Sequence, residues 1–294
     1  MTPEEFLRGC SLEITAKDLE SLGEARASLP LETAISITYL PTNSIDELIA
    51  SAAHVRRLGF TPVPHISARR VRSRHDLERF LRGLETEAQI DRAFIIGGDP
   101  DSPVGPFGSA LEVIETGLLS DIGVTQVGIA GYPEGHPKLS PACLRDALHD
   151  KLQCLSKQGH SAEIVTQFVF DSDPVLNWLA ALRQDGVETP VRIGIPGPAT
   201  LQSLLRFAAR CGVAASTKAL SKYGVSLRRL MSTTTPDQLV QSLAGKLVDN
   251  QHGRVGSHLY PFGGLGKTAL WLSRLAVDSP TSSELEPESN RVSI

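Results

Sequence analysis

The chain of 294 residues lacks several features that mark particular classes of protein. Its four cysteines stand far apart, with no CxxC pair and no Cys/His cluster, which argues against a zinc site and a secreted disulfide framework. No apolar run reaches the roughly 18 residues of a membrane-spanning helix, and the N-terminus, MTPEEFLRG, is acidic and polar. We therefore expect neither a membrane span nor a signal peptide, and we expect a cytoplasmic protein.

The chain also has no strong excess of charge of one sign. The formal net charge is −4, so the composition gives no electrostatic reason to expect nucleic acid or an acidic membrane as a partner. The most basic stretch, SARRVRSRHD (67–76), is short and has no interleaved aromatic residues, which also disfavours nucleic-acid binding. Hydrophobic residues make up 41% of the chain, enough to bury a full core.

What the chain does contain is an alternation of short apolar runs with longer amphipathic stretches. Most of the short runs are apolar throughout, as is typical of strands that are covered on both faces. They are SLEIT (11–15), AISITYL (34–40), PVPHIS (62–67), AFIIGG (93–98), VGIAGYP (127–133), EIVTQFVF (163–170), VRIGIPG (191–197) and SHLYPF (257–262). The amphipathic stretches include 44–59, 174–186 and 200–212.

This eightfold alternation predicts an α/β fold, a (β/α)8 TIM barrel, whose usual size is about 250 residues. A doubly wound open sheet is the alternative, but the first strand-to-helix turn, SLEITAKDLES, has no GxGxxG fingerprint. No linker and no internal repeat divides the chain, so we expect a single barrel domain over residues 1–276. The last stretch, 277–294, is rich in Ser, Pro and Glu and is expected to be a disordered tail.

In a barrel of this kind the functional residues lie where the strands end, at the C-terminal face. Polar residues late in apolar strands also need partners or a pocket, because burying them unpaired is costly. The candidates at these positions are Glu13, Thr38, Tyr39, His65, Gly97, Gly98, Asp99, Tyr132, Glu134, His136, Gln167, Asp171, Pro196 and Gly197.

The stretch GLGKT (264–268) looks like the end of a nucleotide-binding P-loop. The full motif is GxxxxGK[ST], and its first glycine would fall at position 261, where the chain has Pro261. Proline removes a backbone N–H from the phosphate cradle, so we reject an ATPase. A glycine-rich turn before a helix remains, and with Lys267 it could still hold an anion; a plain turn is the alternative.

Several short stretches, taken together and in this order, resemble the methylenetetrahydrofolate reductase family. They are PHIS (64–67), AFIIGGDP (93–100), GIAGYPEGHP (128–137), IVTQFVFD (164–171) and IPG (195–197), within a resemblance that runs from about residue 11 to 275. The family fold is a (β/α)8 barrel. The resemblance implies a flavoprotein oxidoreductase in which NAD(P)H reduces FAD, and the flavin then converts 5,10-methylenetetrahydrofolate to 5-methyltetrahydrofolate. Neither the choice of NADH or NADPH nor the direction of the reaction follows from the residues.

The resemblance also implies roles for individual residues. Glu13 is the expected acid that opens the folate five-membered ring to a 5-iminium cation, and a pKa raised by burial would suit this role. Asp99 is expected beside both the flavin and the folate, and Gln167 is expected to hydrogen-bond the pterin. The remaining flavin contacts are expected from Thr38, His65, Gly97, Gly98, Tyr132 and His136.

Three stretches depart from the family pattern. The residues after Glu13 are Ile-Thr-Ala-Lys, without the usual aromatic residues and proline. The helix before the sixth strand reads LQCLSKQGHSA (152–162), with only Lys151 and Lys157 near the expected basic, phosphate-facing cluster. An arginine expected near the folate tail aligns with Gly264, and Lys267 is the proposed substitute there.

A cluster of arginines after the third strand offers compensation, and we hypothesise that some of them hold cofactor phosphates or the folate glutamate. These are Arg69, Arg70, Arg72 and Arg74. A solvated loop paired with Asp76 and Glu78 is the alternative. Two other functions stay open: an FAD-independent folate reductase, and a tetrahydrofolate-binding partner protein without redox chemistry. Family members are commonly oligomeric, so a homo-oligomer is also an open expectation.

Overall fold

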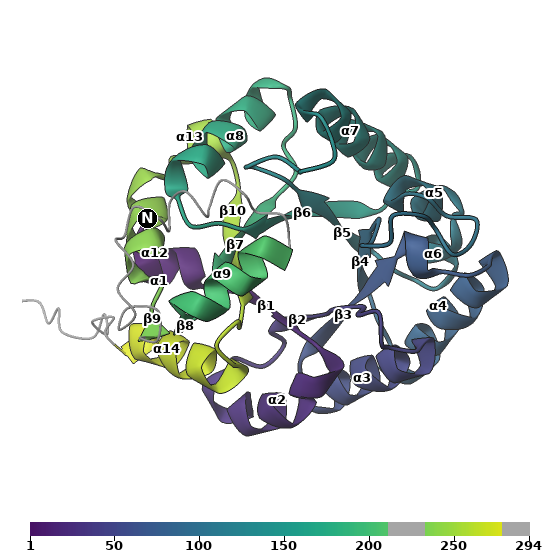
Figure 1. Ribbon diagram of the computed structural model, residues 1–294, viewed down its shortest axis with the longest axis horizontal. Helices are drawn as coiled ribbons and strands as arrows, with labels where there is room; N and C mark the ends of the chain where they lie inside the picture. Colours follow the sequence, from purple (N-terminus) through teal and green to yellow (C-terminus); the bar gives the residue numbers. More distant parts are fainter. Residues whose placement is uncertain (211–232, 278–294) are drawn as a thin grey trace, which may run out of the picture.

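The computed structural model describes residues 1–210 and 233–277. Eight parallel strands close into a barrel in the order β1-β10-β7-β6-β5-β4-β3-β2, surrounded by helices (Figure 1). The strands are β1 (Ser11–Ile14), β2 (Ala34–Ile37), β3 (Thr61–Ser67), β4 (Arg92–Ile96), β5 (Gln126–Gly131), β6 (Ser161–Phe168), β7 (Val191–Pro196) and β10 (Val255–Tyr260). The predicted (β/α)8 barrel is confirmed; the predicted disordered tail lies outside the described residues from 278 onward.

Helices follow or precede almost every strand and pack on the outside of the barrel (Figure 1). They are α1 (Pro3–Leu7), α2 (Leu19–Ala25), α3 (Ile45–Arg57), α4 (Arg74–Ala88), α5 (Ala110–Glu115), α6 (Leu118–Asp121), α7 (Pro141–Lys157), α8 (Ser172–Gln184), α9 (Leu201–Arg210), α12 (Asp237–Lys246), α13 (Asp249–His252) and α14 (Leu265–Val277). Short 3-10 turns cover Ala16–Asp18, Arg26–Ser28 and Ala68–Arg70. A small antiparallel ribbon pairs β8 (Ala199–Thr200) with β9 (Thr233–Thr234).

Local sequence explains where the helices begin. The Ser44 side chain accepts a hydrogen bond from the backbone N–H of Glu47, whose side chain accepts one from the backbone N–H of Ser44. This capping box starts α3, because it satisfies two backbone donors that the first turn leaves free. The predicted amphipathic stretches 44–59 and 174–186 are confirmed as α3 and α8. The stretch 200–212 contains α9, and its last two residues lie outside the described residues.

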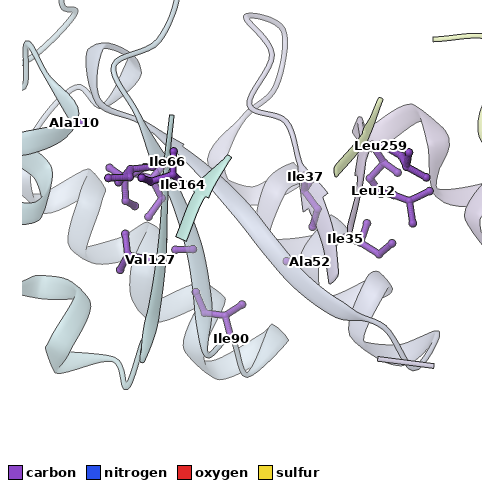
Figure 2. Packing of buried hydrophobic residues seen from close by; sticks show 14 of the residues in the cluster. Leu12, Ile35, Ile37, Ala52, Ile66, Ile90, Ala110, Val127, Ile164 and Leu259 are labelled. Carbon is purple, nitrogen blue, oxygen red and sulfur yellow. The ribbon is translucent and has the colours of Figure 1, made fainter. Parts of the chain in front are cut away.

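The hydrophobic core lies between the strands and the ring of helices. Leu12, Ile35, Ile37 and Leu259 are each 0% exposed and lie on neighbouring strands (Figure 2). Side chains alternate between the two faces of a strand. The residues next to these core positions, among them Glu13 and Ser11, therefore point to the barrel interior, and the site is built there.

Some features are absent from the described part of the chain. No helix within residues 1–210 and 233–277 is long and apolar enough to cross a membrane. In the same ranges no group of three or more His, Cys, Asp and Glu side chains is placed to hold a metal ion. Cys10, Cys143 and Cys154 are free thiols, and Cys211 falls outside the described residues.

Candidate active site

The centre of the site is the carboxylate of Glu13, which β1 carries near its C-terminal end. Glu13 Oε2 lies 3.7 Å from His65 Nε2 on β3 and 3.9 Å from His258 Nε2 on β10. The two histidine side chains are almost fully buried, whereas the Glu13 side chain is 23% exposed. The carboxylate is therefore held between two imidazoles and still reaches the barrel mouth.

The charge state of this cluster differs from the sequence-based prediction. Burial acts to raise the pKa of Glu13, but the imidazoles of His258 and His65 act to lower it and outweigh burial, so the pKa lies below its ordinary value. The predicted upward shift is therefore wrong, because the sequence did not reveal the flanking imidazoles. Burial lowers the pKa of His65 to about 4, against the opposing effect of Glu13. At neutral pH the site holds a carboxylate beside a neutral His65.

His258 is a site residue that the sequence reasoning missed. It is 1% exposed, and its Nδ1 lies 2.7 Å from the hydroxyl of Ser11, which is itself 4% exposed. The register of β1 against β10 places Ser11 opposite His258. A polar residue in the middle of the predicted strand 257–262 was the available signal, because strand alternation puts His258 and Tyr260 on the same face.

Three buried polar atoms at or just after the C-terminal ends of β2 and β3 have no hydrogen-bond partner among the described residues: Thr38 Oγ1, His65 Nδ1 and Ser67 Oγ. They belong to the ends of two neighbouring strands, β2 and β3. An unsatisfied buried polar group costs about 1–3 kcal/mol, and native proteins contain few of them. Hydroxyl and imidazole groups of this kind suit the polar edge of a heterocycle, so this part of the mouth is suited to a ligand that carries such an edge.

Gly97 and Gly98 follow β4, and the structure explains why position 98 requires a glycine. Gly98 has φ +92°, and a Cβ at this position would lie 2.0 Å from Ser67 Oγ. At Gly97 a Cβ would meet none of the described residues within 4 Å. Gly98 is thus fixed by packing and backbone conformation, whereas Gly97 has no such packing constraint from the described residues.

Asp99 does not join the Glu13 cluster in this structure. Its side chain is 89% exposed, and Oδ2 lies 3.6 Å from the guanidinium of Arg70, whose side chain is 15% exposed. The carboxylate of Asp99 helps to raise the pKa of Tyr132, for which burial is the larger cause. Asp99 therefore lies at the rim, close enough to Tyr132 to act on it electrostatically.

The rings of Tyr132 and His136, both in the segment after β5, contact each other and form one wall. Their rings meet edge to face with centroids 5.3 Å apart. His136 Nδ1 accepts a hydrogen bond from the backbone N–H of Lys138 at 3.2 Å. Burial, with the charges of Lys138 and Arg69, lowers the pKa of His136. A neutral His136 with Nδ1 occupied would present Nε2–H as a donor.

Gln167 lies at an irregularity of β6. The register between β6 and β7 shifts between Val165 and Phe168. Thr166 Oγ1 donates to the Gln167 carbonyl at 2.7 Å and accepts from the Gly194 N–H at 2.9 Å. Bulges of this kind redirect a side chain and are frequent next to active sites. No hydrogen bond to the Gln167 amide is found from any residue that the structure describes, so the amide is available to a ligand.

An aromatic cluster on the β6 and β10 side of the mouth was also not predicted. Phe207 on α9 stacks on Phe262 with centroids 4.2 Å apart and an interplanar angle of 16°. Phe168 contacts Phe262 and Tyr260 edge to face, at 4.7 and 5.6 Å. The Tyr260 hydroxyl donates to the Thr166 carbonyl at 3.0 Å. These rings pack α9 onto the end of the barrel, which only the tertiary structure could show.

The glycine-rich stretch before α14 is explained by packing. A Cβ at Gly263 would lie 2.0 Å from the Pro198 carbonyl oxygen, and Gly264 has φ +105°. Gly263 therefore lets the connection after β10 approach the connection after β7 closely, and Gly264 permits the positive φ just before α14. Lys267 lies in the first turn of α14, exposed to solvent. Its anion-binding role stays a prediction.

The basic residues near the mouth divide into groups with different partners. The Arg69 guanidinium donates to the carbonyls of Gly108 at 2.8 Å and Pro100 at 3.2 Å, so it braces a loop. Arg74 pairs with Glu78 at 3.2 Å along α4, as the solvated-loop alternative expects. Arg70 contacts Asp99, as described above, and Arg72 is exposed.

The two lysines of α7 both lie in the second half of the helix. This helix begins after β5 and ends before β6, so it runs away from the C-terminal face of the barrel. Lys157 closes its last turn at the opposite end of the barrel. Burial lowers the pKa of Lys151, which lies in the middle of the helix. Neither position resembles the end of a strand, where ligands of such barrels bind.

The fold and the site define a (β/α)8-barrel protein with a carboxylate-centred ligand site at its C-terminal mouth. The model of the methylenetetrahydrofolate reductase family matches residues 31–244, well over half of the chain. The chain belongs to this family, so the resemblance drawn from the sequence is confirmed.

Individual relatives are more distant. Methylenetetrahydrofolate reductase 2 of Saccharomyces cerevisiae is 34% identical over 80 residues, which are 27% of this chain and 13% of the yeast protein. A solved structure described as an uncharacterized protein from Clostridium thermocellum that binds two copies of 5-methyl-5,6,7,8-tetrahydrofolic acid superposes with a TM-score of 0.57. It is 13% identical, and the match covers 90% of this chain and 92% of that one. At this identity the likeness shows a shared fold.

Proposed function

We propose that this protein is an oxidoreductase that interconverts 5,10-methylenetetrahydrofolate and 5-methyltetrahydrofolate, with FAD as cofactor and NAD(P)H as hydride donor. Membership of the family supports the reaction class. The yeast relative is a methylenetetrahydrofolate reductase by name, and the protein of the same fold from Clostridium thermocellum binds a methylated tetrahydrofolate. Both agree with a reduced folate as the substrate.

One observation carries the proposal more than any other: Glu13 lies at the barrel mouth with its Oε2 between His65 and His258. The reaction passes through a folate 5-iminium cation, and a carboxylate in a partly desolvated site stabilises a positive charge strongly. Because the pKa of Glu13 is lowered, the carboxylate is negative at neutral pH. This charge favours the cation that ring opening creates.

Glu13 is also our candidate for the proton donor that opens the folate ring. The lowered pKa means that this carboxyl must first take up a proton, so the acid step is favoured at low pH. Gln167, held at the β6 bulge, is the candidate that hydrogen-bonds the pterin through its amide. Lys267 is the candidate for a carboxylate of the folate tail.

The polar wall of β2 to β5 is the proposed flavin site. Among the described residues, Thr38 and His65 supply buried polar atoms without hydrogen-bond partners, and none of these residues would contact a Cβ at Gly97. The rings of Tyr132 and His136 form the adjoining wall. A bound flavin would accept a hydride from the nicotinamide and pass it to the folate. Asp99 would face this site from the rim after a change of side-chain rotamer, since it is exposed here.

The first experiment is an absorption spectrum of the purified protein with and without added FAD. Visible flavin bands that NAD(P)H bleaches and methylenetetrahydrofolate restores would support the full proposal. A protein that stays colourless with FAD, yet oxidises NAD(P)H in the presence of methylenetetrahydrofolate, would instead be an FAD-independent reductase.

The departures in the phosphate-binding stretch favour keeping that second candidate, because both lysines of α7 lie in the half of the helix that is further from the end of β5. A third outcome separates the remaining alternative. Tight binding of a reduced folate with no oxidation of NAD(P)H and no oxidation of methyltetrahydrofolate by an added acceptor would identify a folate-binding protein without redox activity.

A further inference from the structure

Behind Glu13 lies a buried pair, Ser11 and His258, joined by a hydrogen bond between their side chains. We propose that these two are positioning residues: the Ser11 hydroxyl donates to His258 Nδ1 and so fixes the tautomer in which His258 Nε2–H faces Glu13 Oε2. Their effect on catalysis rests on the proposed function, whereas the tautomer itself does not.

The hydrogen-bond geometry distinguishes two arrangements. Ser11 Oγ and His258 Nδ1 are 2.7 Å apart, so one of them donates to the other. If Nδ1 carried the proton, the lone pair of Nε2 would face the Glu13 carboxylate at 3.9 Å. The Ser11 hydroxyl would then also need another acceptor, and no second hydrogen bond of its side chain is found within the described ranges. With Ser11 as donor, every polar hydrogen meets an acceptor or a negative charge.

Electrostatics in a buried site favours the same arrangement. Ser11 and His258 are 4% and 1% exposed, and charges interact more strongly there than in water. An N–H that points at a carboxylate is attracted to it, and a lone pair is repelled. The negative Glu13 therefore favours the Nε2–H tautomer, and the Ser11 hydroxyl favours the same tautomer by donating a hydrogen bond to Nδ1 on the other side of the ring.

The consequence for Glu13 is asymmetry between its two oxygens. His258 from β10 and His65 from β3 both direct Nε2 to Oε2. The uncharged hydroxyl of Thr38, just after β2, makes no hydrogen bond within the described residues but also acts to lower the pKa of Glu13. Oε2 is thereby turned towards the barrel interior, which leaves Oε1 for a ligand in the mouth. His258 stabilises the ionised carboxylate, so it helps to lower the pKa of Glu13.

Nitrogen NMR of protein labelled with 15N-histidine reads the tautomer directly, without substrate or cofactor. Spectra of the full chain and of His258→Gln assign the His258 ring signals. We expect a protonated Nε2 and an unprotonated Nδ1 in the wild type, and a mixture of tautomers in Ser11→Ala. A protonated Nδ1 in the wild type, or a Ser11→Ala spectrum identical to it, would overturn the proposal.

Ser257→Ala is the matched control. Ser257 precedes His258 on β10, is 0% exposed, and donates its hydroxyl to the Phe6 carbonyl at 3.1 Å. Its loss removes a buried hydroxyl of equal size without touching the ring of His258, so the tautomer should not change. If Ser11→Ala does not fold, Ser11→Thr keeps a hydroxyl and should keep the wild-type tautomer; loss of that tautomer would count against Ser11 as the donor.

A second readout is the pH profile of methylenetetrahydrofolate reduction. Activity should fall as the pH rises through the pKa of Glu13, and Ser11→Ala should move this fall to higher pH by up to about one unit. The same variant should lower the maximal kcat with little change in KM. His258→Gln, which keeps an N–H, should retain about tenfold more activity than His258→Leu. A fall in activity with an unmoved pH profile would show a merely structural role. Absence of any folate reaction would refute the proposed function and leave the NMR result standing.

Discussion

At the scale of single residues, Glu13 carries the largest expected effect. Glu13→Gln keeps the shape of the side chain but removes both the negative charge and the acid. We expect methylenetetrahydrofolate reduction to fall at least about 100-fold, in the range that general acid–base groups contribute. Reduction of the flavin by NAD(P)H should change little, because that half-reaction needs no proton from Glu13. Stopped-flow measurement of the two half-reactions provides its own control, and equal losses in both would contradict the assignment.

His65 makes the stability of the protein depend on pH. Its pKa is about 4 in the folded chain, against roughly 6.5 in an unfolded chain. Between these pH values His65 binds a proton in the unfolded chain but not in the folded chain. Stability is therefore highest above about pH 6.5 and falls by about 2–3 kcal/mol as the pH drops towards 4. Glu13, whose pKa is lowered, adds a loss in the same direction below its unfolded pKa.

Urea unfolding of the wild type and His65→Gln at pH 8 and pH 5 measures this effect. The free-energy difference between the two proteins at pH 8 reports the lost packing, and its change at pH 5 isolates the titration. The variant should lose much less stability than the wild type between the two pH values. An equal loss of unfolding free energy in the two proteins between pH 8 and pH 5 would show that His65 takes up its proton as readily in the folded as in the unfolded state.

The sequence could predict which residues stand at strand ends, because period and position determine that. Glu13, Thr38 and His65 are brought together near the mouth in this way. It could not predict the pair Ser11 and His258, whose hydrogen bond joins residues 247 positions apart across the closure of the barrel. The direction of the Glu13 pKa shift depended on this unseen neighbour, so it was missed as well.

At the scale of elements, the end of β4 offers a sharp comparison of two adjacent glycines. Gly98→Ala combines an unfavourable positive φ with a clash at 2.0 Å from Ser67 Oγ. We expect a loss of about 2–3 kcal/mol in the free energy of unfolding. Gly97→Ala meets nothing within 4 Å and should cost under about 1 kcal/mol.

Chemical denaturation of these variants measures how much stability Gly98→Ala loses and shows whether the clash with Ser67 causes the loss. The double variant Ser67→Ala with Gly98→Ala should recover the steric part of the loss and keep the part due to backbone conformation. If Gly97→Ala and Gly98→Ala destabilise equally, the packing of Gly98 against Ser67 is not what requires a glycine there.

All eight predicted strands are found, with ends that differ by a few residues. The apolar run 34–40 overshoots β2, which ends at Ile37, and the predicted strand 257–262 lies two residues later than β10. Side chains beyond a strand end can be apolar because they pack under neighbouring loops. The β6 bulge, by contrast, arises from pairing with β7, and no local pattern of β6 alone reveals it.

At the scale of the whole molecule, neighbouring strands of the barrel differ in how many residues they pair. β1 pairs with β10 over two residue pairs and with β2 over three, whereas β5 and β6 pair over six. The strand that carries Ser11 and Glu13 therefore has the fewest paired residues. We expect its amides to exchange with solvent faster than those of β5 and β6, because short ladders open at lower free-energy cost.

Hydrogen exchange with mass spectrometry measures this difference peptide by peptide. Binding of a folate at the mouth should slow exchange in β1 more than in β5, since the ligand contacts Glu13. Uniform protection of all eight strands without ligand would show that the barrel opens as one cooperative unit.

The small ribbon of β8 and β9 has a practical meaning for protein engineering. Thr200 is paired with Thr233 and Ala199 with Thr234, so residues more than 30 positions apart are fixed side by side. The distance between these two paired points is set by the ribbon and does not depend on the number of residues that join them. A fluorescent reporter or a second enzyme could be inserted between positions 210 and 233, and the ribbon would still hold residues 200 and 233 side by side.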